Sequence, residues 1–554
     1  MTPLGVRGIA HIGPPMAPPA TQNATGLRDW QRRALDLMDN WRTGPFLIAA
    51  APGAGKTRPA LEAARELLRR GEVDRVAVVC PTSPLTRQWA TAAARAGLQI
   101  LPDAPELRTS RDYDGVAVTY ARVASVAATY GRQCTERTLV IVDEAHHLGD
   151  DLAWGQGFVT AFARAGRWLL LSGTPFRTDE AAIPGVEYDS DGVAVPDLAY
   201  SYAEAIRDGV CRKVVFVPYD GTLQWQSGDE VIESSFDDVV ATRERGRRFR
   251  TAISTELPDG LPRILKNADD KLSELRSSGH RDAGGLVVAA DGEHARAIAR
   301  VIHEITGRSP VVVLHKEPRA HLKLEAFRAG RDPGVVAVNM VSEGVDIPRL
   351  RVGVYATVAK TPLIFRQIVG RFVRVAASRG PDQESWLYLP GDPYLRQLAA
   401  TVEEEVRVGR RDDPFADEGI EDDDLAPPRE PRTDDDDGPG FVPLSADVAP
   451  QMNLFGEPEP APAPVRAAPA AGVQAPPAEL DEPGAPLYAR RAGLRAERQK
   501  LVGSLRRVTG EPFPQINARV NAKAGVARVE DATVAQLERS IGLLLDELTA
   551  ASRR

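Results

Sequence analysis

The chain has 554 residues, of which 43% are hydrophobic and 26% are charged, and this length is too great for a single hydrophobic core. Such a composition is typical of globular proteins and predicts roughly two to four domains. No apolar run approaches the length of a membrane span, and the Pro-rich start lacks a signal-peptide core, so we expect a cytoplasmic, nucleoid-associated protein without a membrane partner.

The net charge is unevenly distributed along the chain. The formal net charge is −8, but residues 403–437 hold sixteen acidic residues against five arginines, a net of −11, which leaves +3 for the rest. The folded parts can therefore present basic surfaces, and the negative total does not exclude nucleic acid as a partner.

The three cysteines, Cys80, Cys134 and Cys211, are far apart in the sequence. None has a Cys or His partner at metal-ligand spacing, so we expect neither a disulfide framework nor a zinc site. Cys80 ends an apolar run and is expected to lie in the core.

The first part of the chain alternates short apolar strands with helices. Residues 1–23 are rich in Pro and small residues and are expected to be disordered. A helix is predicted over 27–37, a strand in the apolar run that begins at Phe46, and further strands over 76–80, 116–119, 139–142 and 168–171. This alternation predicts a parallel sheet with its functional residues at the carboxyl ends of the strands.

The loop after the first strand, AAPGAGKT at 50–57, is predicted to hold phosphate. The small residues Gly53, Ala54 and Gly55 allow backbone N–H groups to approach a phosphate closely, and the start of the following helix adds a positive field. Lys56 would then contact the β and γ phosphates of ATP, and the Thr57 hydroxyl would hold Mg²⁺.

A carboxylate pair, Asp143 and Glu144, follows the buried strand at 139–142. In such sheets this position meets the phosphate loop, so we expect Asp143 to hold Mg²⁺ and Glu144 to orient and deprotonate the attacking water. The alternative for an isolated pair of this kind is that the carboxylates cap the next helix.

A second series of strands begins after residue 213. Strands are predicted over 286–289, 311–314, 335–338 and 352–356, and a last strand over 386–389 is expected to close the sheet. No second phosphate loop accompanies them. We therefore predict an α/β fold with two tandem doubly wound parallel-sheet domains, at 24–213 and 214–405.

Beyond these domains the composition changes abruptly. Residues 406–485 are rich in Asp, Glu, Pro and Ala and are expected to form a disordered acidic linker. Residues 486–554 return to helical periodicity and are basic, with thirteen Lys and Arg against seven Asp and Glu, so a small all-α domain is predicted. Its last helix is expected to start at Thr533, with Gln536 completing a capping box. This domain is either a second DNA contact or partner-docking bundle, or a small helical domain with a solvated charged face.

At this point the residues resemble those of a known family, the DEAH-type superfamily 2 helicases and translocases. The resemblance runs from about Leu27 to Leu389 and rests on motifs in the family's order. They are Gln31, AAPGAGKT at 50–57, PTSPLTRQW at 81–89, DEAH at 143–146, SGT at 172–174, VNMVSEGVDIP at 338–348 and QIVGRFVR at 367–374.

The resemblance implies two RecA-like domains and the cofactors ATP and Mg²⁺. Gln31 would read adenine, Asp346 would contact the nucleotide, and Pro81, Thr82 and Thr119 would contact the DNA backbone. His146, Ser172 and Thr174 would couple hydrolysis to movement. Gln367, Arg371 and Arg374 would act from the second domain, where arginines can neutralise a leaving γ phosphate. The alternative for Arg371 is an interdomain salt bridge.

Motifs SGTPFR, EGVDIP and Q..GR..R most resemble the XPB, UvsW and type I/III restriction-translocase branch, which acts mainly on duplex or branched DNA. The function we expect is therefore an ATP-dependent DNA helicase or translocase in repair, recombination, replication or defence. The alternatives are an RNA helicase of the same superfamily, and a clamp-tethered scaffold that uses ATP as a switch without strand separation.

One short motif lies within the predicted linker. Residues 451–455 read QMNLF and resemble the peptide by which bacterial replication and repair proteins bind the sliding clamp. Leu454 and Phe455 would fill an apolar pocket on the clamp, and Gln451 would hydrogen-bond at its edge. The alternatives are that these residues pack back on the motor or have no role.

Overall fold

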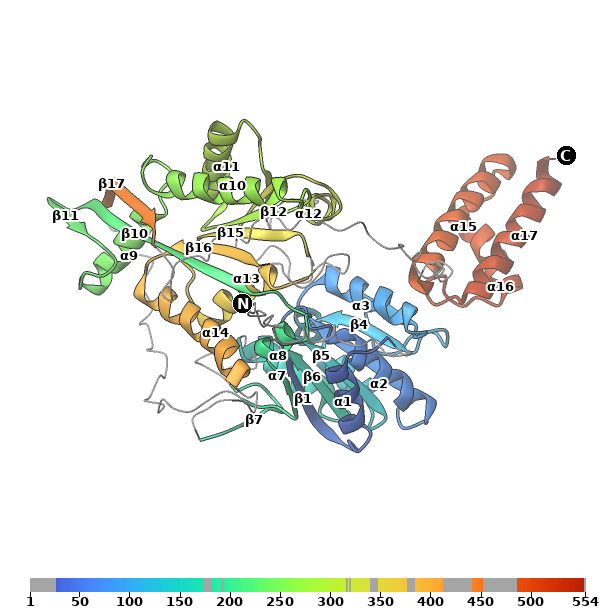
Figure 1. Cartoon of the computed structure of the whole chain (residues 1–554). Coiled ribbons are helices and arrows are strands. Elements are labelled where there is room, and N and C mark those ends of the chain that lie inside the picture. The colour runs from blue at the N-terminus through green and yellow to red at the C-terminus, as the bar shows by residue number, and fades with distance from the viewer. Residues whose placement is uncertain are drawn as a thin grey trace, which may run out of the picture.

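The computed structural model describes residues 26–150, 152–173, 182–190, 194–314, 317, 320–338, 347–375, 384–411, 441–451 and 486–552. Two α/β units and a separate helical unit are visible in it (Figure 1). Among the described helices, none is both long and apolar enough to cross a membrane.

The first unit is built on a seven-stranded sheet in which every pairing is parallel (Figure 1). Its strands, in spatial order, are β3 (Ile100–Pro102), β4 (Gly115–Thr119), β2 (Arg75–Cys80), β5 (Thr138–Asp143), β6 (Arg167–Ser172), β1 (Gly44–Ala50) and β9 (Leu198–Tyr200). A small separate hairpin joins β7 (Glu187–Tyr188) to β8 (Ala194–Val195).

Helices cover both faces of this sheet because its strands are apolar on both sides. Neighbouring residues of one strand enter different cores: Ile48 packs with Trp30 and Leu61 on one face, whereas Leu47 lies in the cluster on the other. The helices are α1 (Asp29–Met38), α2 (Thr57–Arg69), α3 (Ser83–Arg95), α4 (Tyr120–Ser125), α5 (Ala127–Gln133), α6 (His147–Asp150), α7 (Leu152–Phe162) and α8 (Tyr202–Arg207).

The strand order explains how distant motifs meet. Strands β5, β6 and β1 are adjacent and parallel, with Ile48 opposite Leu171 and Leu170 opposite Val142. Because parallel strands end at the same edge, the loop after β1 and the residues after β5 and β6 come together there.

The second unit also has a mainly parallel sheet. In spatial order, the strands along this sheet are β11 (Glu230–Ser234), β10 (Val214–Ser227), β16 (Ser385–Pro390), β15 (Leu350–Ala356), β12 (Gly284–Ala289), β14 (Gly334–Val338) and β13 (Val311–Val313). Its helices are α9 (Thr242–Ala252), α10 (Leu261–Ser277), α11 (Gly292–Thr306), α12 (Ala320–Ala329), α13 (Pro362–Phe372) and α14 (Pro393–Arg411). The two sheets confirm the predicted fold class.

The predictions for the end of this unit were partly wrong. The strand expected to close the sheet, β16, lies inside it, between β15 and β10. In addition, β17 (Phe441–Pro450), within the segment predicted as a disordered linker, pairs antiparallel with β10. Since β16 ends opposite Tyr219, the rest of β10 offers an edge to another strand, and Ala446 and Val448 become buried there. Residues 406–411 are the end of α14, and residues 412–440 and 452–485 lie outside the described residues.

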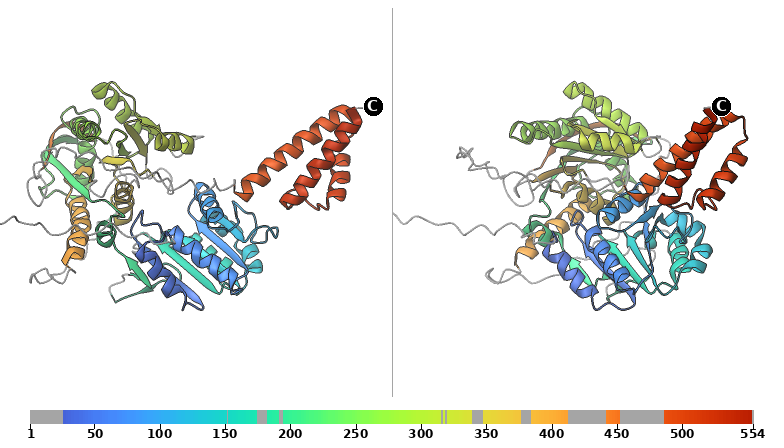
Figure 2. Two further views of the ribbon diagram at one scale, coloured as in Figure 1. Left: turned by 45° about the vertical axis from the view of Figure 1, so that its right-hand side comes forward. Right: turned by 90° about the vertical axis from the view of Figure 1, so that its right-hand side faces the viewer.

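The C-terminal unit consists of three helices, α15 (Leu487–Thr509), α16 (Phe513–Ala524) and α17 (Val534–Ser552). The predicted capping box is confirmed: the Gln536 N–H donates to Thr533 Oγ1 at 3.2 Å, and the Thr533 N–H donates to Gln536 Oε1 at 2.9 Å. The unit projects from the first α/β unit (Figure 2). Arg491, 2% exposed, joins the two by donating to Ser110 Oγ at 2.7 Å and covering the Tyr113 ring.

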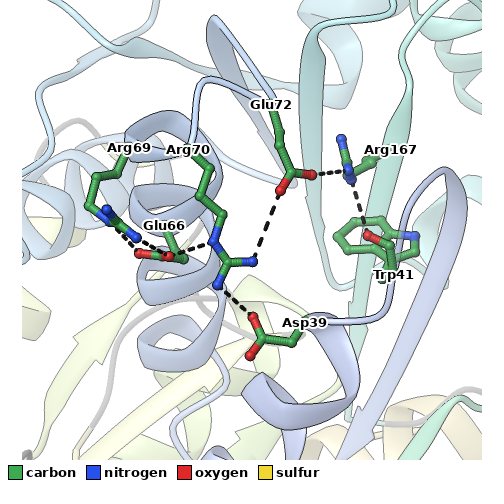
Figure 3. Close-up of polar contacts among 7 residues, drawn as sticks. All are labelled: Asp39, Trp41, Glu66, Arg69, Arg70, Glu72 and Arg167. Atoms are coloured by element: carbon green, nitrogen blue, oxygen red, sulfur yellow. Dashed lines mark hydrogen bonds and ion pairs between the residues drawn. The ribbon is translucent and has the colours of Figure 1, made fainter.

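A polar cluster ties α1 and α2 to the start of β6, at the edge of the sheet opposite the phosphate loop (Figure 3). Glu66 Oε1 accepts hydrogen bonds from Arg69 Nη2 and from Arg70 Nε, each at 2.6 Å. Arg70 also donates to Asp39, and Glu72 accepts from Arg167. The bonds from Arg69 and Arg70 lower the pKa of Glu66 to about 2.

This pKa predicts a pH-dependent stability. Because the folded-state pKa of Glu66 lies below its ordinary value of 4.5, the stabilisation is present above about pH 4.5 and is lost as the pH falls towards about 2. The side chain is 35% exposed, so solvent screening makes the effect small. We expect Glu66→Gln to lower the thermal unfolding midpoint at neutral pH and the difference from wild type to shrink below pH 4.5. Circular dichroism melts at several pH values measure this, and a difference that stays constant down to pH 3 would contradict the assignment.

Candidate active site between the two domains

The loop between β1 and α2 has the backbone geometry expected of a phosphate site. Gly53 and Gly55 have φ values of +81° and +89°, which glycine adopts without steric cost. Lys56 Nζ donates to the Ala50 carbonyl at 3.1 Å, and Thr57 is the first residue of α2. The loop N–H groups and the positive end of a 13-residue helix therefore meet at one place, beside a lysine.

Gln31 lies against this loop. It is 5% exposed, its Nε2 donates to the Gly55 carbonyl at 3.0 Å, and its Oε1 accepts from the Arg28 N–H at 3.0 Å. Arg28 Nη1 donates to the Ala54 carbonyl at 2.5 Å. Both residues thus support the phosphate loop, and the adenine-reading role expected for Gln31 stays a prediction.

Asp143 and Glu144 lie at the end of β5, beside the loop. Glu144 has a φ of +53°, a left-handed conformation that costs a non-glycine residue roughly 1–3 kcal/mol. The Ala145 N–H donates to the Leu171 carbonyl at 2.9 Å, and Tyr120 OH donates to the Asp143 carbonyl at 2.7 Å. These bonds hold the strained turn that carries the two carboxylates.

The two carboxylates have different proton affinities. Burial and the neighbouring Glu144 charge raise the pKa of Asp143 to about 6. Burial alone would also raise the pKa of Glu144, but the charge of Lys56 lowers it below its ordinary value. Glu144 is therefore ionised at neutral pH and can accept a proton.

His146 connects three of the predicted motifs. It is 1% exposed, its Nδ1 lies 3.1 Å from Ser172 Oγ and 3.7 Å from Glu144 Oε2, and its Nε2 lies 3.3 Å from Gln367 Nε2. Because the Gln367 amide nitrogen can only donate, Nε2 is the acceptor and Nδ1 carries the proton in the neutral ring. A side chain of the second domain thereby contacts the residue next to the carboxylates.

The second domain also packs directly on the phosphate loop. A Cβ added at Gly370 would lie 2.9 Å from Pro52 Cβ, so only glycine permits this approach of α13. Arg374 covers Gly53, whose added Cβ would lie 3.0 Å from Arg374 Cγ. Arg371 is half-buried on α13. The two arginines expected to act on the γ phosphate thus come from a segment that contacts its binding loop.

The residues expected to contact DNA lie at strand ends of the first domain. Pro81 and Thr82 follow β2, and Thr82 is the N-cap of α3. Thr119 ends β4 and caps α4, with its Oγ1 accepting from the Arg122 N–H at 3.2 Å. The parallel pairing of β2 and β4 brings the two segments to the same edge of the sheet. Thr174, Asp346, Leu454 and Phe455 lie outside the described residues.

Sequence reasoning missed the segment that joins the domains. Cys211 Sγ donates to the Pro52 carbonyl at 3.3 Å, and the Arg212 N–H donates to the Val373 carbonyl at 2.7 Å. The Arg212 guanidinium, on a residue 2% exposed, donates to the carbonyls of Pro348 and Arg374. No local sequence pattern predicts that this segment joins the domains, because the groups that accept its hydrogen bonds are backbone carbonyls of residues distant in the sequence.

The ligand chemistry at this site suits a magnesium ion. Thr57 at the start of α2 and Asp143 at the end of β5 offer a hydroxyl and a carboxylate, the hard oxygen ligands that Mg²⁺ prefers together with phosphate oxygens and water. Within the described ranges, no group of three or more His, Cys, Asp or Glu side chains is placed to hold a metal ion by itself.

Part of the first domain matches a known protein family. Residues 25–177 match the family described as type III restriction enzyme, res subunit. The uncharacterized protein Rv2917 of Mycobacterium tuberculosis is 45% identical over 386 residues, a match that covers 68% of this chain and 63% of that protein. An uncharacterized protein of Mycobacterium leprae is 42% identical over 393 residues, covering 69% of this chain and 65% of that protein. The chain thus spans slightly less than two thirds of these relatives.

Among solved structures, the chain matches the ATP-dependent type ISP restriction-modification enzyme LlaBIII bound to DNA at 15% identity and a TM-score of 0.44, covering 70% of this chain and 30% of that one. With a res-subunit match over residues 25–177 and the motif residues gathered as described, the chain resembles the superfamily 2 helicases and translocases.

Proposed function

We propose that this chain is an ATP- and Mg²⁺-dependent helicase or translocase that acts on duplex or branched DNA. The observation that carries the proposal is the packing of the second domain on the phosphate loop, through Gly370 against Pro52 and Arg374 against Gly53. A nucleotide bound there would contact both domains, so its hydrolysis would change how they are held together.

Each group at the site has a distinct task in this proposal. Lys56 and the loop N–H groups bind the phosphates, Glu144 orients the attacking water and takes its proton, and Arg371 and Arg374 neutralise charge on the departing phosphoryl group. A magnesium ion held by Thr57 and Asp143 would supply positive charge to the phosphate oxygens. His146 would transmit changes at the carboxylates to the second domain, because it contacts both Glu144 and Gln367.

We propose residues 24–213 and 214–405 as the two motor domains, with β17 as an added strand of the second. DNA is preferred over RNA because SGTPFR, EGVDIP and Q..GR..R resemble the branch that acts on DNA. Backbone contacts by Pro81, Thr82 and Thr119 would make binding salt-sensitive and largely independent of sequence. The basic unit at 486–554 would add a second contact.

The test is steady-state ATP hydrolysis without nucleic acid and with single-stranded DNA, duplex DNA, a fork or RNA, with Lys56→Ala as the blank. Stimulation by DNA, strongest with duplex or fork and absent in Lys56→Ala, is the expected result. Stimulation by RNA alone would favour the RNA helicase alternative. DNA binding without ATP-driven displacement of strands or bound proteins would favour the ATP-switched scaffold.

A bacterial sliding clamp is proposed as a second partner, through Gln451, Leu454 and Phe455. The Gln451 N–H donates to the Pro218 carbonyl at 2.8 Å, which holds the start of the motif at the sheet of the second domain. Changing Leu454 and Phe455 together to Ala is expected to abolish clamp binding, measured by surface plasmon resonance, because the apolar pocket loses both occupants. ATP hydrolysis should not change. Clamp binding that survives the double substitution would rule the motif out.

A further inference from the structure

Two buried aromatic side chains connect the segments expected to contact DNA with the carboxylate pair. The first is Trp89, on the helix that Thr82 caps. Trp89 is 2% exposed, and its Nε1 donates to Asp143 Oδ2 at 2.7 Å. The indole N–H is the only polar group of tryptophan, and a hydrogen bond to an ionised carboxylate is stronger than one between neutral groups.

The second is Tyr120, which directly follows Thr119 and is the first residue of α4. Tyr120 is 1% exposed, and its OH donates to the Asp143 carbonyl at 2.7 Å and lies 3.4 Å from the Glu144 carbonyl. Its ring stacks on Trp154 at 5.6 Å between centroids, which fixes where the hydroxyl lies. The bond therefore orients the peptide that leads into the left-handed Glu144.

We propose that Trp89 and Tyr120 are positioning residues that transmit nucleic-acid binding to the hydrolytic site. A small movement of α3 reaches the Asp143 side chain through Trp89, and a movement of α4 reaches the Glu144 backbone through Tyr120. The two links act on different groups, because one ends on a carboxylate oxygen and the other on a peptide carbonyl. This inference rests on the proposed function, and it adds the route by which DNA would stimulate hydrolysis.

Two conservative substitutions test the links in the full-length protein. Trp89→Phe and Tyr120→Phe each remove one hydrogen-bond donor and keep an aromatic ring in the core. The chain offers matched controls in the same domain: Trp168, whose Nε1 donates to the Phe162 carbonyl at 3.1 Å, and Tyr130, whose OH donates to the Ala104 carbonyl at 2.9 Å. Trp168→Phe and Tyr130→Phe remove comparable bonds whose acceptors are backbone carbonyls other than those of Asp143 and Glu144. Thermal melts of all four variants monitor folding.

The expected results differ between the two variants. Trp89→Phe should raise the Mg²⁺ concentration needed for half-maximal nucleotide binding by about 10-fold or more, as is typical when a residue that supports a metal ligand is lost. A fluorescent non-hydrolysable ATP analogue measures this binding. Tyr120→Phe should lower the DNA-stimulated kcat while the KM for ATP and the Mg²⁺ dependence stay at wild-type values. Both variants should bind duplex DNA as wild type does and lose part of the stimulation by DNA.

The proposal is overturned if Trp89→Phe and Tyr120→Phe match Trp168→Phe and Tyr130→Phe in Mg²⁺ dependence and in DNA stimulation. It is also overturned for Trp89 if the loss of stimulation follows from weaker DNA binding alone. Failure of the proposed function is distinguishable, because wild-type protein would then show no stimulation by nucleic acid, whereas the Mg²⁺ titration of Trp89→Phe would still test the contact with Asp143.

Discussion

Replacing Arg374 with Ala is expected to reduce ATP hydrolysis by about 10³-fold or more, since that is the usual effect of losing an arginine that stabilises charge on a transferred phosphoryl group. Arg374 covers Gly53 of the phosphate loop, although it belongs to the second domain. Because the loop itself remains intact, nucleotide binding should weaken far less than hydrolysis. Hydrolysis rates and the affinity for a non-hydrolysable analogue, measured on the same samples, separate the two effects.

Two further variants sharpen this prediction. Arg374→Lys keeps the charge but loses the planar fork of donors, so it should restore only part of the rate. Arg296→Ala removes an exposed arginine of the same domain, whose Nη1 donates to the Gly292 carbonyl at 3.4 Å, and should hydrolyse ATP as wild type does. If Arg374→Ala lost nucleotide binding and hydrolysis in equal measure, the residue would act in binding or in domain packing instead.

Replacing Glu144 with Gln is expected to reduce hydrolysis by roughly 10²–10⁴-fold, the usual contribution of a general base. The amide cannot accept a proton from water, although it has nearly the same shape as the carboxylate. The lowered pKa of Glu144 means that the wild-type side chain is ionised at neutral pH. Nucleotide binding should persist, because the phosphate loop and Lys56 are unchanged.

The matched control for this substitution is Glu66→Gln, the same chemical change at the opposite edge of the sheet (Figure 3). It should leave hydrolysis unchanged. Single-turnover experiments with excess enzyme measure the chemical step without product release. Wild-type single-turnover rates in Glu144→Gln would exclude Glu144 as the base and leave the helix-capping alternative.

The segment between the domains links the phosphate loop to Arg374 through hydrogen bonds. The Arg212 guanidinium donates to the carbonyls of Pro348 and Arg374, and the neighbouring Cys211 Sγ donates to the Pro52 carbonyl. Burial raises the pKa of the Cys211 thiol to about 12, so the thiol stays protonated and remains a donor. The segment between the domains therefore contacts the phosphate loop and the Arg374 backbone together.

The sequence by itself determined the local features of this protein. Apolar runs predicted the strands of two parallel sheets, and small residues before Lys56 predicted a loop that two left-handed glycines do form. Thr533 and Gln536 predicted a helix start that their hydrogen bonds confirm. These features depend on residues close together in the chain, where spacing alone fixes which groups can meet.

Only the tertiary structure decided the contacts between distant segments. The strand at 441–450 lies in a segment whose composition predicts disorder, and it forms because β10 extends beyond β16 and offers it an edge. The bond from Trp89 to Asp143, the contact of Gln367 with His146, and the carbonyls bound by Arg212 likewise join residues far apart in the chain. Such contacts depend on strand order and domain packing, which no local pattern of residues encodes.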